Sequence, residues 1–414
     1  MTCSCSRREF LVRGLYGLGV GATLPLVLNR TSAALAAQAL AGTSIEKHPE
    51  RILVVVELSG GNDGLNTIVP YGDPAYYRAR PTLAVPERAA ITIADGFGLH
   101  PSMVGFERLY KDGRLAVVHG CGYDRPSLSH FSSMDFWHTG APNSGESLGW
   151  LGRLADATYD ASTRNLIVNL GNAQSLAVRS RRHSALVFDD PARFRREGTD
   201  EEKKVIAGLS QPAATTNPTL EFLAATAQNA AESSDFVRQA SASYRTPVDY
   251  GIGGGLGANL QRVAALIAAG MPTRLYYVTY AGNAFDTHVQ QADLHSRLLM
   301  YTADAVRGFI EDVERLGRAE DVSVMIFTEF GRRVEENGSL GTDHGTATPM
   351  FVAGRGVHGG FYGTPPSLTD LDDGNLKMTT DFRRVYATMI DEWLGCDETE
   401  AILKGRFESL GIFA

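Results

Sequence analysis

Short apolar runs recur along the chain, each about as long as one β-strand. The first, residues 51–58, reads Arg-Ile-Leu-Val-Val-Val-Glu-Leu, and a continuous β-branched run is typical of a strand buried on both faces. Similar runs lie at 115–119, 165–170, 185–188, 274–280, 322–328 and 349–353. The pattern therefore predicts a sheet that is covered by helices on both sides.

A longer apolar pattern, between residues 289 and 316, has helical spacing. Its apolar side chains recur every three or four positions, at Leu294, Leu298, Tyr301, Val306, Phe309, Ile310 and Val313. Strands separated by helices are typical of a mainly parallel α/β sheet. We therefore predict one α/β domain over residues 42–414, with a mainly parallel sheet flanked by helices.

Residues 198–257 break this pattern. The stretch is rich in Ala, Ser, Thr, Gln and Asn, and we interpret it as a helical insertion or cap with a loop at 211–218 and a flexible glycine-rich segment at 251–257. No strand leads into these glycines, and no Lys-Ser/Thr pair follows them. A phosphate-binding loop is therefore disfavoured, and with it a redox protein that uses a nicotinamide or a flavin.

The first 41 residues have the layout of a twin-arginine export signal. Arg7 and Arg8 precede a glycine-rich apolar run at 14–28, and small residues that follow offer cleavage after Ala36 or Ala41. The apolar run is shorter than the ~20 residues of a spanning helix, so we expect no stable membrane span after cleavage. The twin-arginine export machinery carries folded cargo, which predicts a periplasmic or secreted protein and favours a metal bound before export.

Composition narrows the class of protein further. With 43% hydrophobic and 21% charged residues, the chain resembles an ordinary soluble globular protein. A formal net charge of −8, without a dense Lys/Arg patch, argues against nucleic acid as a partner. Only Cys121 and Cys396 follow the signal, so a thiolate zinc cluster is excluded.

Polar residues that follow the predicted strands are the candidates for chemistry, because an open parallel sheet binds ligands beyond the carboxyl ends of its strands. Asp63 follows the first strand in a glycine-rich loop, which is either a tight turn or a close approach to an ion. Ser129 and His130 follow the second strand, and they either act as nucleophile and catalytic partner or cap and pack the next helix. The other serines that compete as nucleophile are Ser127, Ser132 and Ser133.

The third candidate group lies where the long helix begins. Asp286 and His288 offer a carboxylate oxygen and an imidazole nitrogen, a ligand set that suits zinc or manganese. His295 lies on the same helical face as His288 and is a weaker candidate. In the alternative interpretation Asp286 caps the helix and His295 is solvated.

The fourth group follows the strand at 322–328. Asp343 and His344 lie between glycines, and this pair either binds one or two metal ions or forms a turn without a ligand. Arg332 or Arg333 either clamps an anionic ester or is a surface charge.

Taken together, these segments resemble a bacterial family known only as domain of unknown function 1501. The resemblance covers nearly the whole chain and rests on ELSGGNDGLN at 57–66, SHFSSMDFW at 129–137, FDTH at 285–288, TEFGRR at 328–333 and GTDHG at 341–345. That family looks like a branch of the alkaline phosphatase and sulfatase superfamily, whose members hydrolyse phosphate or sulfate esters with one or two divalent metals.

The resemblance implies an alkaline-phosphatase-like fold and a set of functional residues. It implies a serine of the 127–133 segment as nucleophile, for which we choose Ser129, with His130 and Arg332 beside it. This chain departs from the superfamily pattern, since no Cys/Ser-x-Pro-x-Arg context marks the serine and the Asp-x-His spacing is tight. A third histidine ligand is expected near the C-terminal end, where His358 is available. The implied metal ligands are Asp63, Asp286, His288, Asp343 and His344.

Two functions follow as hypotheses. The first is an exported hydrolase of phosphate or sulfate esters that uses one or two ions of zinc, manganese or calcium and binds an anionic ester. The second is a non-catalytic envelope protein of the same fold that binds a glycan or a protein partner.

Overall fold

The computed structural model describes residues 48, 50–194, 232–251, 254–280 and 282–413. Its centre is a nine-stranded sheet in the order β11-β5-β10-β9-β1-β8-β6-β7, with β14 beside β5. The strands are β1 (Ile52–Leu58), β5 (Leu115–Gly122), β6 (Ile167–Leu170), β7 (Leu186–Phe188), β8 (Leu275–Tyr280), β9 (Val322–Phe327), β10 (Thr348–Gly354), β11 (Gly360–Tyr362) and β14 (Thr380–Asp381).

The sheet is mainly parallel, which confirms the predicted class. Each of the seven predicted apolar runs overlaps one of its strands. Strand β1 pairs in parallel with β8 and β9, and β6 pairs in parallel with β7 and β8. Among the described strands of this sheet, β10 alone runs against its neighbours, β5 and β9.

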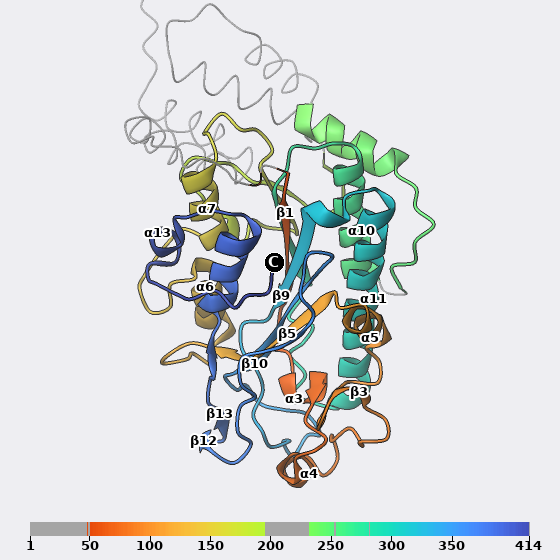
Figure 1. Ribbon diagram of the computed structural model, residues 1–414, viewed down its shortest axis with the longest axis vertical. Helices are drawn as coiled ribbons and strands as arrows, with labels where there is room; N and C mark the ends of the chain where they lie inside the picture. Colours follow the sequence, from red (N-terminus) through yellow and green to blue (C-terminus); the bar gives the residue numbers. More distant parts are fainter. Residues whose placement is uncertain (1–47, 49, 195–231, 252–253, 281, 414) are drawn as a thin grey trace, which may run out of the picture.

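Helices cover both faces of the sheet (Figure 1). Alternate residues of β1 point to opposite cores, with Val54 and Val56 on one side and Leu53 and Val55 on the other, so this strand is buried on both faces as predicted. One face carries α5 (Val104–Lys111), α10 (Gly254–Ala268) and α11 (Gln291–Arg315), and the other carries α6 (His130–Thr139), α7 (Trp150–Thr158), α12 (Arg383–Thr388) and α13 (Thr399–Leu403).

Smaller elements, among them two sheets separate from the central one, lie at the end that Figure 1 places at the bottom. They include α3 (Gly64–Thr67), β2 (Ile68–Val69), α4 (Pro74–Ala79), β3 (Ile91–Ala94), β4 (Phe97–Leu99), β12 (Leu371–Asp372) and β13 (Asn375–Leu376). Single turns lie elsewhere, at η1 (Leu176–Val178), η2 (Ala319–Asp321) and the π-helical η3 (Met389–Trp393).

The long helix predicted at 289–316 is α11. It begins after Gln290, and the backbone of Gln290 has a left-handed conformation. A flexible glycine-rich segment was predicted at 251–257. In the structure, residues 254–257 form the first turn of α10. Of the predicted insertion, 232–243 form a helix, whereas the loop at 211–218 and the export signal at 1–41 lie outside the described residues. Among the described residues, no helix is both long and apolar enough to cross a bilayer.

We expect the free energy of unfolding to fall as the pH drops from about 6.5 to about 4, in part because of His100. Burial lowers the pKa of this imidazole to about 4, whereas the unfolded chain takes up the proton near pH 6.5. The unfolded state then binds more protons, which destabilises the folded state by up to about 1.4 kcal/mol per pH unit. His100→Asn removes this titration and keeps an acceptor for the N–H of Ser102, which His100 Nδ1 accepts at 3.2 Å.

Urea unfolding across this pH interval measures the slope of stability against pH. His358→Asn is the matched control, because His358 is exposed. An unchanged slope in His100→Asn, or the same change in both variants, contradicts the prediction.

Candidate metal centre

Loops from four strands meet at one edge of the sheet. Residues 59–63 follow β1, residues 123–130 follow β5, residues 282–290 follow β8, and residues 328–346 connect β9 to β10. Because parallel strands end at the same edge, the polar residues that follow them gather there. Each of the four candidate groups of the sequence has members in these loops.

A glycine turn after β1 forms the floor of the site. Gly60 and Gly61 have φ of +121° and +78°, and a Cβ on Gly60 would lie 2.4 Å from the backbone nitrogen of Asp286, so a larger residue does not fit there. Their N–H groups donate to the carboxylate of Glu329, at 2.9 Å from Gly60 and 3.2 Å from Gly61. The turn therefore holds the fully buried Glu329 in place.

Asp286 lies at the centre of the site. Its Oδ1 accepts from Arg332 Nη2 at 2.8 Å, and it lies 3.0 Å from His288 Nε2 and 3.2 Å from His344 Nε2. Its Oδ2 lies 3.4 Å from His130 Nε2. One carboxylate thus faces three imidazoles that come from three different loops.

Each of these imidazoles is oriented by an acceptor at its Nδ1. The acceptors are Glu329 for His130 (2.7 Å), Asp343 for His288 (3.2 Å) and the carbonyl of Leu128 for His344 (2.8 Å). A carboxylate or carbonyl only accepts, so each Nδ1 carries a proton, and in the neutral ring Nε2 then presents a lone pair. Acceptors behind the imidazoles in this way are typical of metal-binding histidines.

The spacing of the inward atoms fits a cation. His130, Asp286 and His344 each offer a ligand atom within 4.8 Å of the other two, and His288 Nε2 lies 2.9 Å from His344 Nε2. Ligand atoms on a tetrahedral zinc ion are about 3.3 Å apart, given bonds of about 2.0–2.1 Å. The distances from Asp286 to the three Nε2 atoms, 3.0–3.4 Å, are close to that value.

Charge in the site is balanced by neighbouring groups. Burial is the largest single influence on Asp286 and raises its pKa, but the hydrogen bond from Arg332 and the other groups around the carboxylate together outweigh burial, and the net pKa is lowered. Burial lowers the pKa of His344, which keeps this ring neutral with its Nε2 lone pair free for a cation. The hydrogen bond to Glu329 raises the pKa of His130, so a metal at His130 competes with a proton.

Arg332 is buried, with 1% of its surface exposed. Its Nε donates to Gly61 O at 2.6 Å and its Nη1 to Thr342 O at 2.8 Å, while Nη2 donates to Gly60 O and, at 3.1 Å, to Phe285 O. The guanidinium therefore ties three of the four loops together and holds Asp286. It lies against protein atoms, whereas the sequence suggested a clamp for an ester.

Asp63 is not brought to this cluster. Its buried carboxylate pairs with Arg80 Nη1 at 2.5 Å and accepts from Gln291 Nε2 at 2.5 Å, and it caps α3 through the N–H of Asn66 at 3.4 Å. The side chain of Gln291 lies between it and the metal-site loops, since Gln291 Oε1 accepts from Thr342 at 2.6 Å.

The serines of the 127–133 segment separate into exposed and buried ones. Ser129 is exposed and precedes α6 without a side-chain capping hydrogen bond. Ser133 is buried and donates to Glu329 O at 2.6 Å, so it supports the site from behind. His358, the C-terminal candidate, lies at the opposite edge of the sheet, where the next residue bonds to Gly113 ahead of β5. The third imidazole is His130 instead.

Two positioning residues were not assigned from the sequence. Glu329 orients His130, and Asn337 Nδ2 donates to Asp343 Oδ1 and to the carbonyl of His288, each at 3.0 Å. Glu329 directly follows a predicted strand, and a position after a strand is also the signal by which Asp63 was selected. The position of Glu329 in the sequence was therefore the signal that pointed to this residue.

The comparison with protein families gives one match. The family model described as protein of unknown function (DUF1501) matches residues 50–405. No curated protein matches the chain.

Solved structures that are similar to the chain include alkaline phosphatases and a sulfatase. The zinc complex of the C-terminal periplasmic domain of EptC from Escherichia coli is 11% identical with a TM-score of 0.35, covering 76% of this chain and 78% of that one. The lipoteichoic acid synthase LtaP from Listeria monocytogenes is 8% identical with a TM-score of 0.40, covering 90% and 80%. The alkaline phosphatase of the Antarctic bacterium TAB5 is 10% identical with a TM-score of 0.33, covering 75% and 93%.

We expect Arg332→Met to lower the free energy of unfolding by about 3–5 kcal/mol, because it leaves Asp286 and several buried carbonyls without their donor. Arg333→Met is the matched control. The side chain of Arg333 is 37% exposed and pairs with Asp373 at 3.4 Å, and an exposed pair contributes about 0–1 kcal/mol.

Chemical denaturation of both variants measures the difference. Equal stability losses in Arg332→Met and Arg333→Met would show that the buried guanidinium does not hold the loops.

Proposed function

This chain belongs to the DUF1501 family, and we propose that it is an exported metal-dependent hydrolase of phosphate or sulfate esters. The observation that carries the proposal is the convergence of three oriented imidazoles on the carboxylate of Asp286. Without a cation these lone pairs face one another at short range, which is unfavourable in a partly buried site. With a cation the same arrangement is a ligand set of nitrogen and oxygen donors.

The residues fit zinc or manganese better than calcium. His130, His288 and His344 supply imidazole nitrogens and Asp286 supplies an oxygen, whereas calcium prefers oxygen ligands only. A bound divalent cation supplies positive charge that stabilises the oxygens of an ester during displacement. Asp343 orients His288 in this structure, and Asp63 is compensated by Arg80, so we assign both to positions behind the ligands.

Ser129 is the serine we propose as nucleophile. It lies directly before His130, on the exposed side of the cluster, and the carbonyl of Leu128 on its other side contacts His344. It also precedes the first turn of α6, where backbone N–H groups have no partner within the helix and attract an anion.

Exposed apolar side chains border the cluster. Phe131 is 88% exposed and follows His130, and Val289 is exposed and follows His288. Leu128 and Leu340 are also exposed and lie in loops of the site. Grouped apolar side chains at the surface mark binding sites, so we propose that the alcohol part of the ester is apolar, as in an aryl ester.

Export is the part of the proposal that rests on the N-terminal sequence. The pair Arg7 and Arg8 ahead of an apolar run is the twin-arginine layout, and a site loaded with metal before export gives a reason for that route. In this proposal the protein works in the periplasm or outside the cell.

We expect the protein, purified without chelator, to contain about one equivalent of zinc or manganese, and we expect His344→Gln and Asp286→Asn to lose most of it. Each variant removes one inward donor while keeping a side chain of similar size. The readout is elemental mass spectrometry, and His358→Gln is the control because His358 is exposed at the opposite edge of the sheet.

Glu329→Gln extends this test to an orienting residue, and it is expected to weaken metal affinity by about 10–100-fold. If the His344→Gln variant folds and holds as much metal as the unchanged protein, the site assignment is wrong.

Turnover is tested with phosphate monoesters, phosphate diesters and sulfate esters, each supplied as an aryl and as a glycerol ester, with zinc, manganese or calcium. We expect an aryl ester to be hydrolysed fastest, and we expect Ser129→Ala to lower kcat by about 10⁴-fold or more, as loss of a nucleophile does. Ser132→Ala is the matched control, since Ser132 is an exposed serine in the first turn of the same helix.

Equal activity of Ser129→Ala and Ser132→Ala would withdraw the nucleophile assignment. A metal-loaded protein that hydrolyses none of these esters would favour the second hypothesis, a non-catalytic protein that binds a glycan or a protein partner.

A further inference from the structure

Gln291, the first residue of α11, is fully buried. Its Oε1 accepts from the hydroxyl of Thr287 at 3.0 Å and from the hydroxyl of Thr342 at 2.6 Å. Both threonines are buried too, with 2% and 0% of their surface exposed. One amide oxygen therefore joins the loop after β8 to the loop between β9 and β10.

The two threonines directly precede residues of the metal centre. Thr287 precedes His288, and Thr342 precedes Asp343. The Oδ1 of Asp343 lies 3.2 Å from His288 Nδ1, and this pair is partly exposed. An exposed pair holds its geometry only weakly. Gln291 holds the imidazole and its orienting carboxylate more firmly, from the buried residue before each of them.

A buried ion pair fixes the orientation of this amide. Gln291 Nε2 donates to Asp63 Oδ2 at 2.5 Å, and Arg80 Nη1 lies 2.5 Å from the same oxygen. Burial raises the pKa of Asp63, but Arg80 and the other groups around the carboxylate outweigh burial, and the net pKa is lowered. Asp63 is therefore charged and only accepts. The amide nitrogen must face it, which turns Oε1 to the threonine hydroxyls.

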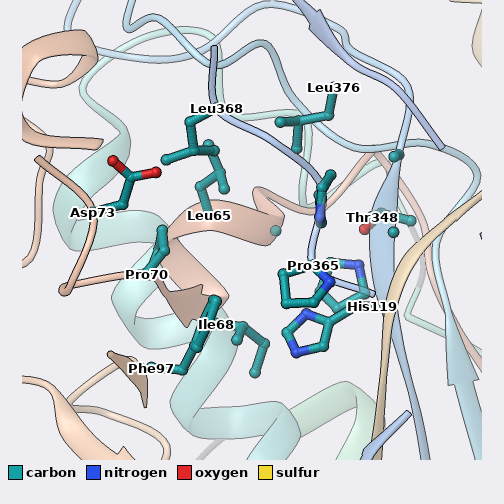
Figure 2. Close-up of a pocket in the computed structure, with 15 residues that line it drawn as sticks. Leu65, Ile68, Pro70, Asp73, Phe97, His119, Thr348, Pro365, Leu368 and Leu376 are labelled. Atoms are coloured by element: carbon teal, nitrogen blue, oxygen red, sulfur yellow. The ribbon is translucent and has the colours of Figure 1, made fainter. Parts of the chain in front are cut away.

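The side chain of Asp63 is enclosed by protein. Helix α3, which Asp63 caps, lines the mainly apolar cavity of about 180 Å³ shown in Figure 2 through Leu65. Asp63 itself is not among the described residues that line this cavity. Its partner Arg80 is also fully buried and donates to the carbonyls of Arg333 at 3.0 Å and Val334 at 2.9 Å. The ion pair thus contacts the same loop, between β9 and β10, that Gln291 holds.

We propose that Gln291 is a positioning residue for His288 and that Asp63 acts on the metal centre through Gln291. The amide oxygen keeps the residues before His288 and Asp343 together, so the ring retains its acceptor and presents Nε2 to a cation. Asn337 bridges the same two residues from the outside, through Asp343 Oδ1 and His288 O. The buried bonds of Gln291 are the stronger ones, because a hydrogen bond strengthens where the local dielectric is low.

The test compares Gln291→Met with Gln290→Met in the full-length protein. Methionine has nearly the length of glutamine but lacks the amide. Gln290 is the matched control, because it is exposed and makes no side-chain capping hydrogen bond. The first readout is nitrogen NMR of the neutral His288 ring in metal-free protein, which distinguishes a proton on Nδ1 from one on Nε2. We expect Gln290→Met to keep the proton on Nδ1, as in the unchanged protein, and Gln291→Met to populate both tautomers.

The second readout is zinc affinity, measured by competition with a chelator, and this measurement alone rests on the proposed function. We expect Gln291→Met to weaken zinc binding by about 10–100-fold, as loss of a residue that orients a metal ligand does. Gln290→Met should bind zinc as the unchanged protein does. If the unchanged protein binds no zinc, the proposed function fails, and the NMR result still decides the role of Gln291.

Thr342→Val guards against misfolding of Gln291→Met, which leaves Asp63 without one donor. It keeps the size of the side chain and the bond from Gln291 to Asp63, and it removes the hydroxyl that lies 2.6 Å from Gln291 Oε1. We expect it to shift the His288 tautomers in the same direction as Gln291→Met. A His288 ring that keeps its proton on Nδ1 in both variants overturns the proposal, even where both are less stable, since Gln291 then serves the fold alone.

Discussion

The buried guanidinium of Arg332 is the interaction on which the metal site depends. It donates to carbonyls of the β1 loop at Gly60 and Gly61, to Phe285 before the Asp-x-His pair and to Thr342 before the Asp-His pair. A buried cation is tolerated only when its donors are used and its charge is balanced, and here Asp286 supplies the balancing charge. Loops that are more than 200 residues apart in sequence are therefore held in one arrangement.

The imidazoles gain their direction from acceptors behind them, and this distinguishes the cluster from an ordinary polar patch. A histidine fixed at Nδ1 turns Nε2 toward the centre, and His130, His288 and His344 all do so around Asp286. Asp63 provides the contrast. Its charge is already compensated by Arg80 inside the protein, so the residue type that faces three imidazoles in one loop stabilises the fold in another.

Much of the fold was predictable because the signal is local. The run at 51–58 shows in its own composition that both faces of the strand are buried, and β1 contacts two cores. The Asp286-x-His288 and Asp343-His344 pairs were likewise selected because each follows an apolar run. His130 was also selected because it follows a predicted strand, but as a catalytic partner, while His358 was taken as the third histidine ligand. Only the fold shows that His130 lies with the other imidazoles and that His358 lies at the opposite edge of the sheet.

By itself the sequence determined the class of sheet, the positions of its buried strands along the chain and the loops in which polar residues gather, since periodicity and turn residues act over a few positions. Only the tertiary structure decided the partners of each charge: Asp63 with Arg80, Glu329 with His130, and Arg332 with Asp286. The physical reason is that a hydrogen bond or ion pair depends on distances of a few ångströms between residues far apart in sequence, and only packing of the whole chain sets those distances.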